Sequence, residues 1–186
     1  MNTSFIKNEI KYDGTLLSPH FIYKNFNLMG DSLISFTGPC EVKLTEMVDL
    51  EDVVNNEPIY SEKMLHFIGE FFNVDLIRGV YMQRLLVTTI KEVLEADYNV
   101  KVIRSGDDLF VNGKKLSVSI ATKSHTSVLI HTALNIITDN TPIATSGLLS
   151  DLNITDIEAL SRKILQAYSD EVKDIYLATT KVRGVM

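Results

Sequence analysis

The dipeptide Asn112-Gly113 constrains the fold more than any other feature of this sequence. It separates two segments in which apolar and polar residues alternate. A tight type I′ turn needs positive φ at both central residues, and Asn-Gly is the pair that adopts this geometry most readily. The pattern therefore predicts an antiparallel hairpin. Because a two-residue turn fixes the register, we expect Phe110 to face Lys115 and Leu109 to face Leu116.

Alternation along the hairpin assigns its side chains to two faces. The face assigned to the core carries Leu109, Leu116, Val118 and Ile120. The other face carries Asp108, Phe110, Lys115, Ser117 and Ser119. In the next expected strand, residues 128–137, His131 and Asn135 share one face. If that strand pairs with residues 115–121, these polar side chains converge on one side of the sheet.

A lysine among hydroxyl and carboxylate groups has a chemical use. A fixed ammonium offsets negative charge on a carboxylate or a phosphate. Neighbouring hydroxyls can position such groups, and Asp108 could hold Lys115 or receive an incoming amine. The polar face of an antiparallel sheet is, however, commonly just its solvated face. Patterning alone leaves both interpretations open.

The rest of the chain predicts an α+β fold with a mainly antiparallel sheet backed by helices. Strands are expected at residues 4–12, 31–36 and 40–44, the last two separated by a turn at Gly38-Pro39, and consecutive strands at 99–135. Helices are expected at 20–27, from Ser61 to residue 72, from Asp75 to residue 94, and from the capping box Thr155-Asp156-Ile157-Glu158 to about Leu177. Residues 46–56 are acidic and are interpreted as a solvated connector with a single helical turn.

Length and composition restrict the class of protein. The 186 residues, 45% apolar and 23% charged, suit one globular domain of residues 1–186. No apolar run approaches the ~20 residues that span a bilayer, so no membrane association is expected. No secretory signal is visible and Cys40 is the single cysteine, which is typical of a cytoplasmic protein. The net charge of −6 argues against a nucleic-acid partner.

Other candidate sites are weaker. His125 and His131 lie near Asp107 and Asp108 in the sequence, but their spacing matches no standard zinc pattern, so no metal ligand is assigned. The sequence contains neither a Walker loop nor a dinucleotide-binding fingerprint. Cys40 has no neighbouring base in the sequence and is interpreted as a small buried apolar residue.

The hairpin also carries a family resemblance. Residues 107–116, Asp-Asp-Leu-Phe-Val-Asn-Gly-Lys-Lys-Leu, resemble the Asn-Asp-Leu…Gly-Arg/Lys-Lys-Leu/Ile stretch of biotin and lipoate protein ligases. Residues 130–136, Ile-His-Thr-Ala-Leu-Asn-Ile, are similar to the strand that follows it in those enzymes. The resemblance implies the fold shared with class II aminoacyl-tRNA synthetases, and activation of a carboxylic acid with ATP before its transfer to a protein lysine. It also implies that Lys115 contacts the acid and the phosphate, that Asp108 lies beside the reacting centre, and that Asn135 matches a strand asparagine.

Over its whole length the chain resembles an uncharacterised family of small prokaryotic proteins, mainly archaeal. This resemblance is carried by residues 30–33, 46–52, 106–108, 111–122 and 130–131. It implies the ligase-like fold and brings no established activity. The Gly-Arg-Gly-Arg-Arg-Gly loop of biotin ligases and the Arg-Arg…Gly-Gly-Gly signature of lipoate ligases are missing. The sequence therefore leaves open whether ATP and Mg²⁺ are used, and whether the protein is an enzyme at all.

The leading hypothesis is a small-molecule-binding protein for a carboxylate, an acyl group or a nucleotide, with acyl transfer or ligation as its reaction. The catalytic candidates are Lys115 and Asp108. The substrate-binding candidates are Arg104, Ser117, Ser119, His131 and Asn135. Two alternatives stay open: a non-catalytic ligand binder on the same fold, and a protein-interaction module that forms a homodimer through an edge strand.

Overall fold

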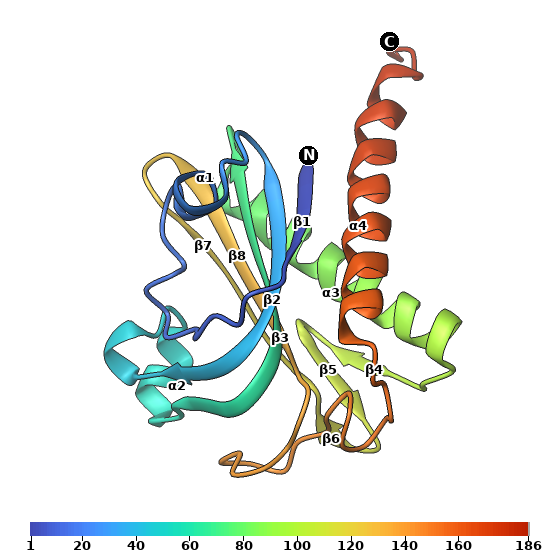
Figure 1. The fold of residues 1–186 in the computed structure, drawn as a ribbon. Helices are drawn as coiled ribbons and strands as arrows, with labels where there is room; N and C mark the ends of the chain where they lie inside the picture. Colours follow the sequence, from blue (N-terminus) through green and yellow to red (C-terminus); the bar gives the residue numbers. More distant parts are fainter. Residues whose placement is uncertain (186) are drawn as a thin grey trace.

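A five-stranded sheet forms the centre of the molecule in the computed structural model, which describes residues 1–185 (Figure 1). Its strand order is β1-β2-β3-β8-β7. The strands are β1 (Asn2–Ile6), β2 (Ser32–Val42), β3 (Ile59–Phe72), β8 (Ser127–Asn135) and β7 (Ser117–Lys123). β1 pairs with β2 in parallel, and the other neighbours pair antiparallel. The predicted α+β class with a mainly antiparallel sheet is confirmed.

The predicted hairpin belongs to a separate three-stranded sheet of β4 (Ile103–Ser105), β5 (Asp108–Val111) and β6 (Lys114–Lys115). Asn112 and Gly113 have φ angles of 52° and 75°, as the turn requires. Phe110 pairs with Lys115, which confirms the predicted register. One residue after β6, the chain enters β7 of the large sheet, so the hairpin connects the two sheets.

Two long helices, α3 (Leu76–Tyr98) and α4 (Ile157–Thr180), cover one face of the five-stranded sheet (Figure 1). The larger core cluster lies between these helices and the sheet. Asp75 caps α3 by accepting a hydrogen bond from the Arg78 N–H, as predicted. Asp156 caps α4 through the Ala159 N–H and takes the position that the sequence assigns to Thr155.

The opposite face of the sheet is covered by the segment between β1 and β2, which includes α1 (Phe21–Phe26). A short 3₁₀ turn, η1 (Leu44–Glu46), and α2 (Leu50–Asn55) follow β2. The smaller core cluster lies on this face and contains Tyr12, Ile34, Phe36, Cys40 and Met64, among others. Within residues 1–185 no helix is long and apolar enough to cross a membrane.

The helix predicted from Ser61 to residue 72 is wrong, because this segment is the central strand β3. Leu65 and Phe67 pack into the larger core cluster, whereas Met64 and Ile68 pack into the smaller one. A strand buried on both faces is apolar at nearly every position, so it loses the alternation that marks a strand.

The turn predicted at Gly38-Pro39 is also wrong, because β2 continues through it with a register shift between Gly38 and Cys40. Such a shift is a β-bulge. A Cβ atom at Gly38 would lie 2.0 Å from the Ile10 carbonyl oxygen, so the glycine lets the N-terminal segment cross the strand closely. The first strand ends at Ile6 rather than at Tyr12, which forms only an isolated bridge with Cys40.

Candidate functional site

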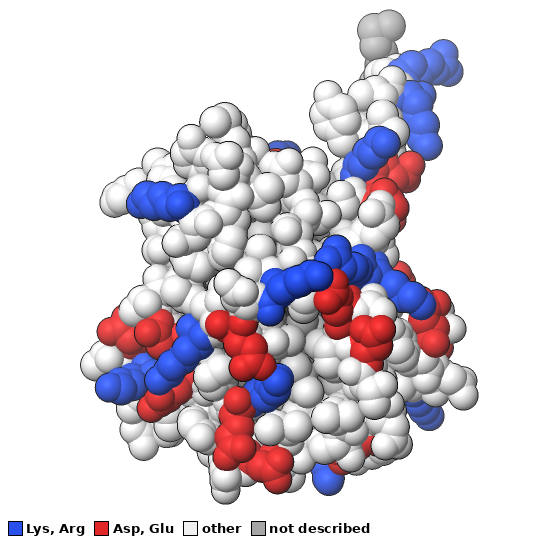
Figure 2. All heavy atoms as spheres, in the orientation of Figure 1, with Lys and Arg blue, Asp and Glu red and all other residues white. Residues whose placement is uncertain are grey.

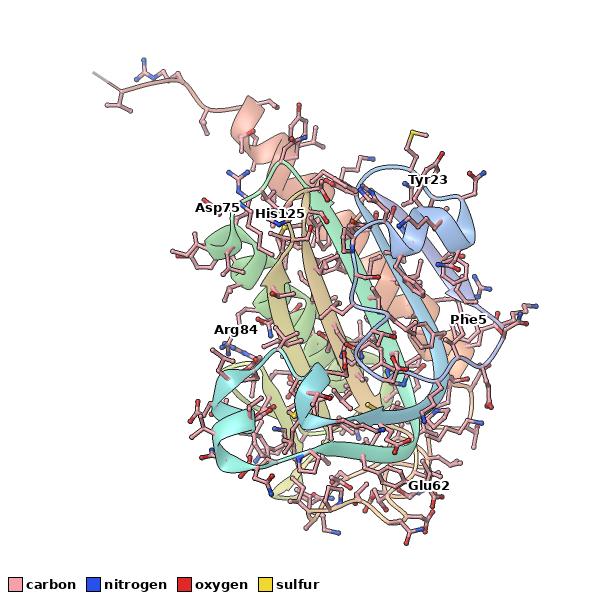
Figure 3. The ribbon with its side chains drawn as sticks, turned by 90° about the vertical axis from the view of Figure 1, so that its left-hand side faces the viewer. Phe5, Tyr23, Glu62, Asp75, Arg84 and His125 are labelled. Atoms are coloured by element: carbon pink, nitrogen blue, oxygen red, sulfur yellow. The ribbon has the colours of Figure 1, made fainter. Side chains whose placement is uncertain are left out.

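A cavity of about 580 Å³ opens on the sheet face that the long helices leave uncovered. Side chains of β3, β7 and β8 form its floor, and Tyr12, the α2 region and the loop at residues 141–145 form its walls. Figure 3 shows this side of the molecule, with α2 at the lower left and α1 at the upper right of the sheet. The volume lies within the range of small-molecule sites in proteins.

Lys115 and Asp108 form an ion pair in the wall of this cavity, with 3.0 Å between Nζ and Oδ1. The hairpin register brings them together, since Lys115 faces Phe110 and Asp108 lies two residues along the same face. Their side chains are 31% and 29% exposed, so a ligand can reach both. A pair exposed to this degree adds little to stability, and its removal should leave the fold intact.

Asn135 and Ser117 line the same cavity, and one polar group of each already has a backbone partner. The Asn135 amide donates to the Leu116 carbonyl at 3.3 Å. The Ser117 hydroxyl accepts a hydrogen bond from the Leu109 N–H at 2.9 Å. Both side chains therefore hold the junction between β6 and β7, next to Lys115.

Ser119 borders the cavity, yet its hydroxyl lies on the α3 side of the sheet. It accepts a hydrogen bond from Gln83 of α3 at 3.0 Å and lies 2.8 Å from the Thr132 hydroxyl. Val118, assigned to the opposite core face from the sequence, packs into the smaller cluster on the cavity side. The predicted alternation holds as far as Leu116 and is reversed beyond it, because the chain passes there from one sheet to the other.

His131 lies on the cavity floor, where its ring stacks on Tyr12 with centroids 3.7 Å apart. The two ring nitrogens of the neighbouring His66 link the His131 ring to a backbone carbonyl. His66 Nδ1 lies 3.1 Å from His131 Nε2, and His66 Nε2 lies 3.2 Å from the Gly38 carbonyl oxygen. These three groups form one hydrogen-bonded chain across β2, β3 and β8.

The protons of these hydrogen bonds can be assigned by starting from the Gly38 carbonyl. A carbonyl oxygen only accepts, so His66 Nε2 must carry a proton. Burial lowers the pKa of His66 to about 4 and lowers the pKa of His131 well below its usual value, so both rings are neutral at pH 7. His66 Nδ1 therefore accepts from His131 Nε2–H, and His131 Nδ1 is left as a hydrogen-bond acceptor.

Arg104 is not part of this site. It is exposed on β4, and its guanidinium donates to the Gly106 carbonyl. Of the seven residues that the sequence nominates, the structure gathers six around the cavity: Asp108, Lys115, Ser117, Ser119, His131 and Asn135. In the part of the chain that the structure describes, no group of three or more His, Cys, Asp or Glu side chains could hold a metal ion.

Sequence reasoning missed three residues of the cavity region, Tyr12, His66 and Ser61. Ser61 is 1% exposed and lines the cavity, and its hydroxyl has no hydrogen-bond partner among residues 1–185. A serine and a histidine within a long apolar run are a usable signal, but the helix expected there concealed which face they share. The acidic residues 46–57, expected to be a solvated connector, also line the cavity.

The whole chain matches one family. The model of DUF366, a domain of unknown function, matches residues 1–183. The chain belongs to the DUF366 family. An uncharacterized protein of Methanocaldococcus jannaschii is 37% identical over 180 residues, which are 94% of this chain and 81% of that protein. A protein of unknown function from Pyrococcus horikoshi has a solved structure that is 36% identical, with a TM-score of 0.89 over 99% of this chain and 100% of that one.

More distant structures show which fold this DUF366 chain has. The lipoate protein ligase of an archaeal lipoylation system from Thermoplasma acidophilum is 13% identical, with a TM-score of 0.64 over 92% of this chain and 83% of that one. Biotin protein ligase from Aquifex aeolicus, solved with biotin and ATP, is 15% identical, with a TM-score of 0.62 over 91% and 70% of the two chains. The fold is that of the biotin and lipoate protein ligases, as predicted from the sequence.

Proposed function

We propose that this DUF366 protein binds a small carboxylic acid, or an acyl derivative of one, in the cavity on the open face of its sheet. The Lys115–Asp108 pair carries the proposal, because it places an accessible ammonium group in the wall of a ligand-sized cavity. Lys115 binds the carboxylate, or the phosphate of an acyl-adenylate. Asp108 orients the ammonium group.

The remaining lining supports an acid with a hydrocarbon body. Val42, Met64, Val118 and Ile120 give the cavity an apolar surface next to its charged wall. Burial of a ligand's hydrocarbon chain against such side chains supplies most of the binding free energy, while a few polar groups fix its orientation. The Aquifex biotin ligase, on the same fold, is solved with a carboxylic acid of this kind, biotin.

Transfer of the acyl group is a second candidate. Within residues 1–185, the second carboxylate oxygen of Asp108 has no hydrogen-bond partner, so it is free to accept a proton from an amine that attacks the acyl carbon of an acyl-adenylate and displaces AMP. Activation of the acid by ATP would release pyrophosphate. We therefore expect pyrophosphate release, dependent on both ATP and the acid, if the protein is an enzyme, and binding without release if it is not.

The test is a thermal-shift screen of biotin, lipoate, fatty acids, amino acids and nucleotides, since a ligand stabilises the native state by mass action. Lys115→Ala should weaken binding of any acid found in the screen by roughly 10- to 100-fold, the effect of losing one charge-assisted hydrogen bond. Its melting temperature without ligand should match that of the wild type.

Lys114→Ala is the matched control. Lys114 is the neighbouring lysine, does not line the cavity and lies 3.9 Å from Asp151, so its loss should leave binding unchanged. Equal losses of binding in both variants would refute a specific role for Lys115. A large drop in the melting temperature of Lys115→Ala would mark the residue as structural.

A further inference from the structure

The cavity is lined by more negative charge than its lysine can balance. Its carboxylates belong to Glu46, Asp49, Glu51, Asp52, Glu57, Asp107 and Asp108, and its single ammonium group belongs to Lys115. Figure 2 shows acidic side chains over α2 and the neighbouring end of the sheet. We call the five carboxylates of residues 46–57 the acidic wall. Negative charge of this density attracts cations and repels a ligand that is only anionic.

Few of these carboxylates have a cationic partner. Asp108 is paired with Lys115 at 3.0 Å and Asp107 with Arg84 at 3.4 Å. The five carboxylates of residues 46–57 form no salt bridge with any group in residues 1–185. Asp49 uses its carboxylate to cap α2, where it accepts a hydrogen bond from the Glu51 N–H, so the carboxylates left for a ligand are those of Glu46, Glu51, Asp52 and Glu57.

Asp52 is the member of the acidic wall whose charge interacts with that of Lys115. The pKa of its carboxyl is raised, first by partial burial and then by Asp49, with Glu57 and Asp108 adding to the effect and Lys115 opposing it. Negative charge at this position is thus poorly compensated by the protein itself. A positive group in the cavity would compensate it.

The uncharged polar groups of the floor give an independent indication. The Ser61 hydroxyl is buried, lines the cavity and has no partner among the described residues. A buried hydroxyl is rarely left unsatisfied, so the Ser61 hydroxyl favours a polar ligand group beside it, toward which it can donate or accept a hydrogen bond. At the other end of the floor, His131 Nδ1 is an acceptor. His131 Nδ1 and the carboxylates of the acidic wall only accept hydrogen bonds, which favours a ligand that carries a donor group.

We propose that the ligand carries an ammonium group, which binds the acidic wall at Asp52, as well as the carboxyl group that binds Lys115. The ligand class is an amino acid with an aliphatic body. The inference rests on the proposed function only in placing the ligand's carboxyl group at Lys115. The carboxylates of the wall are spread along η1, α2 and the loop between α2 and β3, a distribution that suits an organic cation better than a metal ion.

Three matched series of probes test the inference: straight-chain carboxylic acids, ω-amino acids and primary amines, each of two to eight carbons, together with the standard α-amino acids. Binding is measured by calorimetry at low salt. The best amino acid should bind at least about tenfold more tightly than the acid that lacks only its amino group, the gain expected of one charge-assisted hydrogen bond. Equal affinities, or no binding by any amino acid, would overturn the inference.

Asp52→Asn locates the ammonium site, and Asp174→Asn is its control, because Asp174 is an exposed carboxylate on α4 outside the cavity. Asp52→Asn should weaken binding of the best amino acid about tenfold and leave binding of the matching acid unchanged. Asp174→Asn should change neither. Equal effects of Asp52→Asn on both ligands would contradict the inference, as would Asp52-dependent stabilisation by Mg²⁺ in the absence of any effect of amino acids.

The probe series also separates the two proposals. If acids bind through Lys115 and an added amino group brings no gain, the proposed function holds and the ammonium site is wrong. If primary amines bind as tightly as amino acids and Lys115→Ala changes nothing, the ammonium site holds and the carboxylate site is wrong. If no probe of any series binds, the ammonium site is wrong; the proposed function fails as well if biotin, lipoate and the longer fatty acids of the thermal-shift screen also do not bind.

Discussion

His66 and His131 are uncharged in the native protein at neutral pH, and this makes its stability depend on pH. Burial lowers the pKa of His66 to about 4, whereas in the unfolded chain it lies near 6.5. Between these values the unfolded state binds more protons than the native state. The contribution of His66 is therefore fully present above about pH 6.5 and is lost as the pH falls to about 4.

We expect the free energy of unfolding to fall by up to about 3 kcal/mol between pH 7 and pH 4 on account of His66, as measured by urea denaturation at both values. Ring-nitrogen NMR provides the direct test. His66 should keep its proton on Nε2 and stay neutral down to about pH 5. A His66 ring that took up a proton near pH 6.5, the value expected in the unfolded chain, would contradict the assignment.

At the site, the sequence predicts Lys115 and Asp108 best, because a single turn fixes their relative positions. Asn112-Gly113 determines that Lys115 and Asp108 share a face, and the structure brings their charged atoms to 3.0 Å. The orientation of Ser119 could not be obtained in this way, because no local signal marks the passage between two sheets at Leu116. Tyr12 was equally hidden, since it reaches His131 only through the tertiary fold.

At the scale of elements, helix α3 packs on β8 at a distance that depends on a glycine. A Cβ atom at Gly79 would lie 2.4 Å from a methyl carbon of Val128. Gly79→Ala should therefore destabilise the protein by roughly 1–3 kcal/mol, although alanine is the better helix former by about 1 kcal/mol. Urea denaturation measures this loss.

Val128→Ala supplies the control for that explanation, because it removes the methyl groups that the new side chain would meet. In the Val128→Ala background, Gly79→Ala should cost clearly less than in the wild type. If the losses in free energy of unfolding of the two single variants add up to that of the double variant, the glycine is needed for another reason.

The elements differ in how well local pattern predicts them. Helix α3 has a cap at Asp75 and one apolar stripe, and the hairpin strands have a diagnostic turn, so both follow from the sequence. Strand β3 does not, because both of its faces are buried, one under α3 and α4 and the other under the segment between β1 and β2. Only the tertiary fold shows that the apolar residues of 59–72 belong to a buried strand and not to a helix.

At the scale of the whole molecule, the end of α4 extends beyond the body of the protein (Figure 1). Nearly all of residues 174–185 are exposed, including Ile175, Tyr176 and Leu177. A chain that ends at Lys173 should therefore unfold at the same urea concentration as the full chain, because few contacts are lost. Sedimentation of both chains is the companion measurement. A lower unfolding midpoint, together with a smaller sedimenting species, would contradict this expectation and show that this end packs against a second copy, a different contact from the edge-strand pairing of the homodimer alternative.

The hydrogen bond from His66 to the Gly38 carbonyl has a further consequence for how this family can diverge. A main-chain carbonyl oxygen accepts hydrogen bonds whatever residue occupies position 38. A substitution at that position therefore cannot reverse the direction in which the two rings donate their protons. While both histidines are present, His131 keeps its acceptor nitrogen toward the cavity, and only the loss of His66 would free His131 to exchange its tautomer. Descendants of this chain could therefore exchange the hydrocarbon part of their ligand more readily than the polarity of the group that meets His131.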